Sequence, residues 1–389
     1  MYIKHLFYLS LCVTHHIFAN NYPIKSIYDV YNTENSNIKF YKCYNPIPFR
    51  YEPLPVAEYS YFHPHVGCFD QSGVYSIPQG KAYIADWYLI FDTDNNILKE
   101  FIPTSYAPIT HLNNVDFTKV HNTKPTKISG TVAVITGLAY ENYGHWLGEI
   151  LAKLQLLCQS NTNYDWLYFP YEPTFCKEIL SLLNIDTSKL IQLHNDYIQA
   201  DTLIVPSLPA RFIPQQNYHN YAQQHFATLY IPQWHVDWLR ETFIPLASKA
   251  YNKTHVHDKI FISRKDAPVR AILNEDELST YFEKLGFKRY NLAGMSFLEQ
   301  VELFHQAKYI VSAHGAGLTN IIFCNRDVTV IEIFQNQFDS TFWYISQTLG
   351  LQHHCIKTQN LQPICRKSDT SIPTEIIERY IHENISITT

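Results

Sequence analysis

The chain has 389 residues, of which 46% are hydrophobic, 17% charged and 15% aromatic. This composition excludes an intrinsically disordered protein, and the length predicts about two or three domains with separate apolar cores. The formal net charge is −5 and the lysines and arginines are scattered, which argues against a nucleic-acid-binding surface.

The N-terminus, residues 1–19, is apolar. Lys4 precedes the run LFYLSLCV and IFA follows at 17–19, as in a signal peptide with its cleavage site, but His15 and His16 interrupt the pattern. The run is too short to span a membrane unless it is tilted or extended. We therefore interpret it as a signal peptide or an apolar N-terminus, which leaves the localisation open between the cytoplasm and the secretory pathway.

Residues 20–130 alternate between short apolar and polar runs and predict a β-rich N-terminal extension. Asp94 to Asn96 is predicted to be a turn between two strands. Asp92 and Asp94 form an acid-x-acid pair of the kind that holds a divalent ion in transferases of another fold. Because the pair lies in a hairpin turn far from the other candidate residues, we do not interpret it as a metal site.

Residues 131–250 alternate strand and helix. The strand TVAVITGL at 131–138 is followed by a predicted helix at 144–160, and further strands and a helix follow up to residue 206. This order predicts an α/β unit.

Residues 258–356 predict a second and clearer α/β unit. Capping boxes begin two of its helices, at Asn274 with Glu277 and at Ser296 with Glu299, and Gly286 ends the first. The predicted strands lie at 259–263, 286–292, 309–313 and 328–334. This order builds a doubly wound sheet, with a tail and a closing helix in residues 357–389.

The stretch from 309 to 333 combines a buried strand, a glycine turn, a short helix and a strand that carries a carboxylate. The turn His314-Gly315-Ala316-Gly317 leads into a helix at Leu318, and such a turn presents backbone N–H groups to an anion. Glu332 is expected at the edge of the sheet where nucleotides bind, with its carboxylate on a ribose. A tight turn without a ligand remains the alternative, because the third glycine of a dinucleotide fingerprint is missing.

Five segments in the same order resemble glycosyltransferase family 61: NYGHWLGEIL at 142–151, then SRKDAPVRAILNEDEL, FLEQVELFHQA, AHGAGLTN and IEIF. The resemblance covers about residues 131–356. It implies a GT-B fold, in which two Rossmann-like domains face a cleft, with the acceptor side in 131–250 and the donor side in 258–356. It also implies an inverting transfer from a nucleotide sugar, usually linked to UDP, without a required metal ion or other cofactor.

The donor diphosphate needs positive charge as it leaves. Arg264 and Arg270 flank a loop at the predicted strand edge and supply permanent bidentate donors. Asn274 and Glu275 also match the family, but a helix cap and a first-turn acid account for them. The predicted donor residues are Arg264, Arg270, His314, Gly315, Ala316, Gly317, Leu318 and Glu332.

His145 and Glu149 are the candidates for catalysis. They lie four residues apart on one helix face, away from the face of Trp146, Ile150 and Leu154. A histidine suits the removal of a proton from an attacking sugar hydroxyl at neutral pH. Glu149 either orients the imidazole or is the base itself, and HWLGE lacks the HExxH spacing of a zinc site.

Two alternatives to a transferase remain open at this level. A nicotinamide-dependent oxidoreductase also uses a glycine turn followed by an acidic residue, and a non-catalytic protein could bind nucleotide sugars or glycans. The missing third glycine and the two arginines disfavour the first, and the intact His145 and Glu149 disfavour the second. The expected partners are a nucleotide sugar and a glycan or glycoprotein acceptor, with no nucleic acid; neither the sugar nor the acceptor is specified. No cysteine spacing predicts a metal site.

Overall fold

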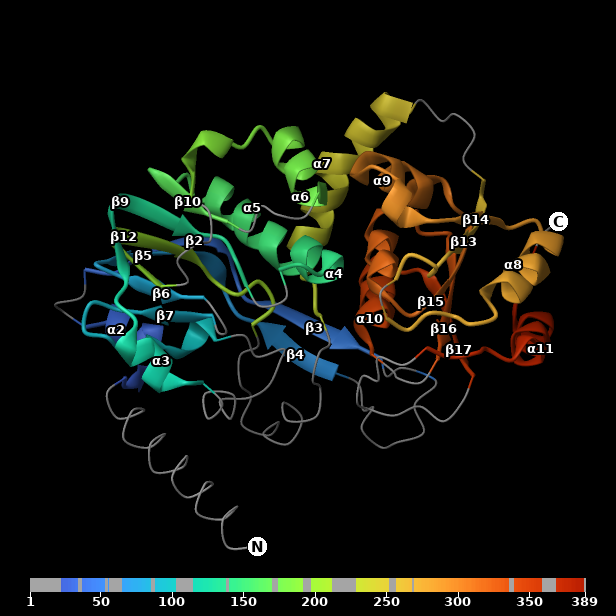
Figure 1. Ribbon diagram of the computed structural model, residues 1–389, viewed down its shortest axis with the longest axis horizontal. Helices are drawn as coiled ribbons and strands as arrows, with labels where there is room; N and C mark the ends of the chain where they lie inside the picture. The colour runs from blue at the N-terminus through green and yellow to red at the C-terminus, as the bar shows by residue number, and fades with distance from the viewer. Residues whose placement is uncertain are drawn as a thin grey trace, which may run out of the picture. The chain divides into compact units, whose positions relative to one another are not determined.

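The computed structural model describes residues 22–33, 37–52, 55, 65–84, 88–102, 115–137, 140–169, 174–191, 197–211, 229–251, 257–267, 269–335, 339–358 and 369–387. The chain divides into two compact units. The first comprises 1–48, 67–141 and 145–227, and the second comprises 49–66, 142–144 and 228–389. Each unit combines helices with a β-sheet (Figure 1), which confirms the α/β class. The GT-B arrangement of two domains around a cleft stays a prediction.

The first unit contains a large mixed sheet, which in the described residues has ten strands. Strands β9, β10, β11 and β12 pair in parallel, and β5 and β6 add antiparallel to β12. The strands predicted for the N-terminal extension therefore continue the sheet of the following α/β segment. The strands are β1 Ile24–Lys25, β2 Lys39–Tyr44, β5 Ser72–Pro78, β6 Lys81–Tyr83, β7 Leu89–Phe91, β8 Ile97–Leu98, β9 Thr126–Val134, β10 Trp166–Tyr168, β11 Leu190–Ile191 and β12 Tyr197–Pro206.

Local sequence explains several connections of this unit. The turn between β7 and β8 is confirmed, because Asp92 accepts hydrogen bonds from the backbone of Asp94 and Asn96 and Asn95 has a φ of 64°. The helices are α2 Ile27–Tyr31, α3 Phe117–Asn122, α5 Leu151–Gln159 and α6 Thr174–Leu182, with short 3₁₀ turns at Lys99–Phe101 and Thr187–Lys189. Three short elements contain residues of both units: helix α4, Tyr143–His145, which precedes α5, and the paired strands β3 Ile47–Tyr51 and β4 His65–Phe69.

The second unit contains an entirely parallel sheet with the strand order β14-β13-β15-β16-β17. All six residues of β16 are buried, as expected for a parallel strand covered on both faces. The strands are β13 Lys259–Ile262, β14 Lys288–Tyr290, β15 Tyr309–Ala313, β16 Thr329–Phe334 and β17 Gln352–Lys357.

Helices α8 and α9 lie where the sequence predicts them, whereas α10 was not predicted. Ser296 and Glu299 form the capping box of α9, and Gly286 follows α8 with a φ of 85°. The capping box predicted at Asn274 is wrong, because its side-chain amide bonds the backbone of Ile372 instead. The helices are α7 Gln233–Tyr251, α8 Glu275–Lys284, α9 Phe297–Gln306, α10 Thr341–Leu349 and α11 Thr374–Asn384, with 3₁₀ segments η5 Leu292–Gly294 and η6 Ala316–Phe323.

The two faces of the parallel sheet differ. One face packs Val311, Ile331 and Ile356 against α8 and α11, which lie together beside the sheet in Figure 1. The alternate residues of the strands point to the other face. There, His314 and His353 contact Phe342 and Ser346 of α10. Both histidines therefore lie on the α10 side of the sheet.

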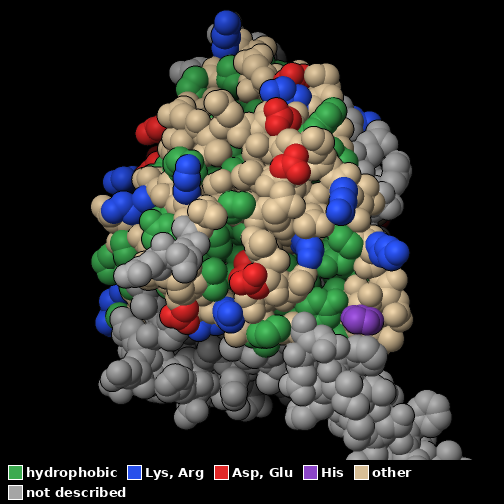
Figure 2. Space-filling view, turned by 90° about the vertical axis from the view of Figure 1, so that its left-hand side faces the viewer, with side chains coloured by type: hydrophobic (Ala, Val, Ile, Leu, Met, Phe, Trp, Pro, Cys, Tyr) green, Lys and Arg blue, Asp and Glu red, His purple; other side chains and the backbone are tan. Residues whose placement is uncertain are grey.

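On the face shown in Figure 2, lysines and arginines alternate with acidic residues rather than forming a basic stripe. Within the described ranges, no helix is long and apolar enough to cross a membrane. The predicted signal peptide, residues 1–19, lies outside the described residues.

Candidate functional site

The carboxyl edge of the second unit's sheet contains its topological switch point. Strands β13 and β15 are neighbours, and the chain proceeds outward from β13 to β14 and from β15 to β16. Ligands of open parallel sheets bind where the strand order reverses in this way. The loop after β13 carries Arg264 and Arg270, and the turn after β15 begins at His314. The fold thus brings both predicted donor segments to one place.

The side chain of Arg264 reaches the glycine turn. A Cβ atom built on Gly315 would overlap its Nη1 atom, so this position has to be glycine while the arginine occupies its place. The φ of Gly315 is 173°, an extended conformation open to any residue. Space, and not backbone conformation, therefore explains the glycine.

Arg264 is a buried cation, with 9% of its surface exposed. Nη2 donates to the carbonyl of Val269 at 2.9 Å and Nε donates to that of Arg270 at 3.2 Å. Among the described residues, no carboxylate forms a salt bridge with this guanidinium. Burial, and then the charge of Arg270, lower the pKa of Arg264 to about 10. It stays charged at neutral pH and faces the turn.

The backbone conformation and the side-chain environment of Arg270 both cost free energy. Its φ is 60°, in the left-handed region where a residue other than glycine costs about 1–2 kcal/mol. Its Nε atom is buried without a hydrogen-bond partner, and such an atom costs about 1–3 kcal/mol. An anion beside Arg264 and Arg270 would offset their mutual repulsion, so the loop can bind a phosphate or diphosphate.

Glu275 fixes the start of this loop. Its side chain is buried and accepts hydrogen bonds from Ser263 Oγ at 2.5 Å and from the backbone N–H of Arg264 at 2.7 Å. The sequence explained this residue only as a first-turn acid. Its match to the family motif was the available signal for a second role, which is to position Arg264.

Glu332 lies inside the strand and not at its edge, because β16 continues to Phe334. Its side chain is fully buried, and burial raises its pKa. Oε1 is 2.5 Å from Nδ1 of His314, and Oε2 is 3.1 Å from Nε2 of His353. Neither oxygen faces solvent, so the geometry favours orientation of His314, and the ribose contact stays a prediction.

His314 is placed by its neighbours. Its ring stacks on Phe334, with the centroids 5.6 Å apart, and packs against Phe342 at 4.9 Å. Because Nδ1 is engaged by Glu332, only Nε2 remains to contact a ligand at the turn.

The remaining predicted donor residues of the glycine turn differ in their exposure to solvent. Ala316 and Gly317 are partly exposed, whereas Leu318 is buried. A Cβ atom on Gly317 would meet Cδ1 of Leu292 at 2.8 Å, so this glycine serves packing. In the same unit, Tyr143 Oη donates to Oδ1 of Asn320 at 2.6 Å, which ties the segment 142–144 to the glycine-turn motif.

In the first unit, His145 and Glu149 face each other. Nδ1 of His145 is 3.6 Å from Oε1 of Glu149, and their side chains are 14% and 20% exposed. The helix between α4 and α5 has a π-helical turn at Trp146–Ile150, a form found often at functional sites. Trp146 and Ile150 are buried, which confirms the two predicted faces.

Lys153 extends this helix face by one more turn and was not predicted as a functional residue. It is 1% exposed; Nζ donates to the carbonyl of Thr136 at 2.6 Å and lies 4.0 Å from the centre of the Tyr88 ring. Burial lowers its pKa to about 8, while Glu149 acts in the opposite direction. The spacing His145-x₃-Glu149-x₃-Lys153 was the available sequence signal.

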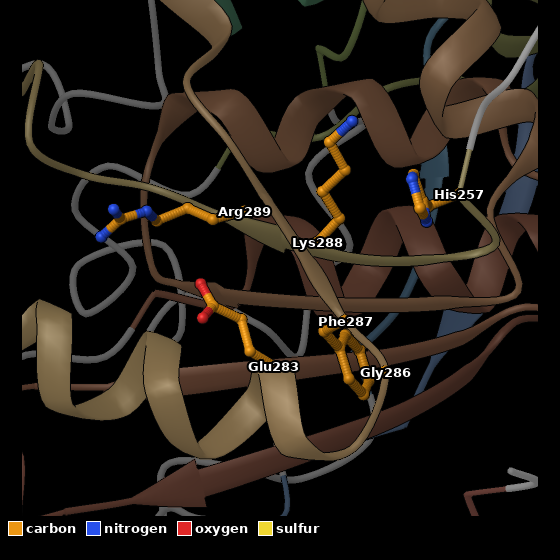
Figure 3. Close-up of a pocket in the computed structure, with 6 residues that line it drawn as sticks. All are labelled: His257, Glu283, Gly286, Phe287, Lys288 and Arg289. Carbon is orange, nitrogen blue, oxygen red and sulfur yellow. The ribbon is translucent and has the colours of Figure 1, made fainter.

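A surface pocket in the second unit lies away from these residues (Figure 3). It is lined by His257, Glu283, Gly286, Phe287, Lys288 and Arg289. His257 precedes β13 and Gly286 precedes β14, so the pocket lies at the amino ends of the strands. Because ligands of parallel sheets bind at the carboxyl ends, we do not interpret this pocket as the donor site.

Comparison with known proteins supports the resemblance seen in the sequence. Residues 143–331 match the family model Glycosyltransferase 61. A stretch of 158 residues is 29% identical to Beta-1,2-xylosyltransferase of Arabidopsis thaliana and covers 35% of this chain and 28% of that protein. A stretch of 107 residues is 27% identical to EGF domain-specific O-linked N-acetylglucosamine transferase of Xenopus laevis, covering 26% of this chain and 20% of that protein. The matched part is thus less than a third of either relative.

Proposed function

Because residues 143–331 carry the Glycosyltransferase 61 match, we propose that this protein is a glycosyltransferase that moves a sugar from a nucleotide donor to a hydroxyl group of a glycan or protein. The observation that carries the proposal is the pair Arg264 and Arg270 beside the glycine turn, at the switch point of the sheet. The missing third glycine of the dinucleotide fingerprint disfavours a nicotinamide enzyme at this place.

The donor is proposed to be a UDP-sugar. Its diphosphate would accept hydrogen bonds from the two guanidinium groups and from backbone N–H groups at the start of η6. The guanidinium groups would supply the positive charge that a metal ion supplies in other transferases, and His314 would contact the diphosphate through Nε2. A xylose or an N-acetylglucosamine residue is the first choice for the sugar, since the two relatives are named for transferring these sugars.

The reaction is proposed to be a single displacement with inversion. The acceptor oxygen forms a bond to the anomeric carbon while the bond from that carbon to the diphosphate breaks. His145 would take the hydroxyl proton, and Glu149 would hold the imidazole in the required tautomer. The bonding electrons leave with the diphosphate, and Arg264 and Arg270 would stabilise its new negative charge.

A panel of nucleotides and nucleotide sugars tests the donor assignment by thermal shift. A ligand at 100 times its dissociation constant raises the free energy of unfolding by about 2.7 kcal/mol. We expect UDP and UDP-sugars to stabilise the protein and Arg264→Gln to abolish the effect. Arg289→Gln is the matched control, because Arg289 is a surface residue paired with Asp276 at 2.7 Å.

Two results would contradict the proposal. The first is stabilisation by NAD or NADP but by no nucleotide sugar. The second is an equal response to UDP in the Arg264→Gln and Arg289→Gln variants, which would place the nucleotide elsewhere. Release of free UDP from a UDP-sugar on addition of an acceptor glycan would then establish transfer.

A further inference from the structure

Three side chains with metal-binding atoms converge inside the second unit's sheet. Glu332 on β16 is the register partner of Cys355 on β17, and His353 lies two residues earlier on the same face. A carboxylate oxygen, a ring nitrogen and the Sγ atom of these residues all lie within 4.8 Å of one another. The site is enclosed, since Glu332 is fully buried and the side chain of His353 is 1% exposed.

Two of these atoms lack a hydrogen-bond partner. Oε2 of Glu332 and Nε2 of His353 are 3.1 Å apart, yet neither forms a hydrogen bond. Buried polar atoms are almost always paired, and an exception points to an ion or a water between the groups. Two ligands of one zinc ion, each bound at about 2.0–2.1 Å with a near-tetrahedral angle, are separated by about 3.1–3.4 Å. The observed distance fits that arrangement.

The second polar atom of the Glu332 and His353 side chains has a partner in each case. Nδ1 of His353 is 2.7 Å from Oγ of Ser346, and Oε1 of Glu332 is 2.5 Å from Nδ1 of His314. Metal-binding histidines and carboxylates commonly have such outer partners, which fix the ring orientation and leave the second atom for the ion.

We propose that Glu332, His353 and Cys355 form a buried binding site for a divalent ion of the zinc class. Thiolate, imidazole and carboxylate are the ligand types that zinc prefers. When the ion binds, the thiol of Cys355 gives its proton to solvent and its sulfur bonds to the metal. One thiolate and one carboxylate then balance the two charges of the ion, so that no net charge is buried.

The ion would serve structure and not the transfer step. It would join β16 to β17 on the side of Glu332 opposite His314, and so hold the carboxylate that orients this histidine. The proposal does not depend on the donor assignment, because the ligands, the distances and the unpaired atoms are independent of any nucleotide.

Elemental analysis of the purified full-length protein tests the site directly. We expect about one zinc ion per chain, and loss of that ion in Cys355→Ala. Cys324→Ala is the matched control, because Cys324 is an equally buried free cysteine of the same unit outside the cluster. His353→Asn and the adjacent His354→Asn form a second pair, since successive strand residues point to opposite faces and only His353 belongs to the cluster.

Cobalt replacement gives a readout that needs no variant. The protein refolded with Co²⁺ should show the near-ultraviolet absorption of a thiolate bound to cobalt, and zinc should remove it. Wild-type protein without stoichiometric metal after refolding with zinc, or with bound cobalt but no thiolate absorption, would overturn the proposal. Equal metal loss in the Cys324 and Cys355 variants would overturn it as well.

Discussion

Two buried cations, Arg264 in the second unit and Lys153 in the first, have much in common. Both donate to backbone carbonyls, and burial lowers the pKa of each, to about 10 for Arg264 and about 8 for Lys153. They differ in what surrounds them. Arg264 lies against the glycine turn beside Arg270, whose Nε atom is unpaired, whereas Lys153 is enclosed by Thr136 and Tyr88.

The comparison shows that burial of a positive charge does not by itself make a binding site. At the edge of the second sheet, two cations repel each other and one keeps an unsatisfied donor, so a ligand anion lowers the free energy of the site. In the first unit, a carbonyl and an aromatic face already contact the ammonium group and partly offset the cost of its burial. Under the proposed function, Arg264 binds the ligand and Lys153 does not.

The largest expected effect on turnover is that of a substitution at His145, on the same helix as Lys153. His145→Ala should lower kcat by about 10²–10⁴-fold, with donor affinity nearly unchanged, because a general base acts in the transition state. Steady-state kinetics over a pH range measures this effect. The wild-type rate should rise with pH and then level off, and this rise should shift or disappear in the variant.

The Glu149→Gln variant tests whether His145 or Glu149 is the general base. A smaller loss than in His145→Ala means that the carboxylate orients the imidazole, and a larger loss means that it is the base. If His145→Ala keeps the wild-type rate at every pH, the histidine is only structural and the whole His145-Glu149-Lys153 face is a packing feature.

Arg264→Gln should give the next largest effect. The loss of a preorganised donor to the leaving diphosphate costs about 10²–10³-fold in turnover, and UDP binding should weaken as well. Lys153→Met should leave UDP affinity unchanged, as calorimetry with both variants would show. Similar losses in the two variants would remove the distinction between the two cations.

Lys153→Met should change stability, and the change should depend on pH. Because the folded-state pKa is about 8 and the ordinary value is 10.5, the unfolded chain binds more protons between these values, and wild-type stability rises with pH there. The free-energy cost of burying the charged Lys153 side chain is fully present below pH 8 and amounts to roughly 3 kcal/mol. Denaturant unfolding at pH 7 and pH 10 measures the free energy of unfolding of both proteins. The amount by which Lys153→Met exceeds the wild type should be smaller at pH 10 than at pH 7. A difference that is the same at both pH values would contradict a buried charge at Lys153.

The smallest effect concerns the glycine turn. Gly315→Ala forces the Arg264 guanidinium to move and should cost about 1–3 kcal/mol in UDP binding or stability. Gly317→Ala should cost less, because its Cβ meets only the end of the Leu292 side chain. Gly294→Ala is the control, since no atom lies within 4 Å of its added Cβ. Equal affinity in all three variants would show that Arg264 does not depend on the turn.

Much of the second unit could be read from its sequence. Strands β15 and β16 are rich in β-branched apolar residues, Ser296 caps α9 and Gly286 ends α8, so local physical preferences specify these elements. The order of these elements also predicted that Arg264 and His314 lie at one sheet edge. The capping box at Asn274 failed because a distant backbone segment, at Ile372, competes for the same amide.

The sequence by itself determined the α/β class, the family resemblance and the residue types of the donor loop, because these follow from local periodicity and motif order. The tertiary structure alone decided that Glu332 is buried against two histidines, that Glu275 holds the backbone of Arg264 and that the early strands extend the first sheet. These features depend on strand register and on contacts between segments far apart in the chain, which no local pattern encodes.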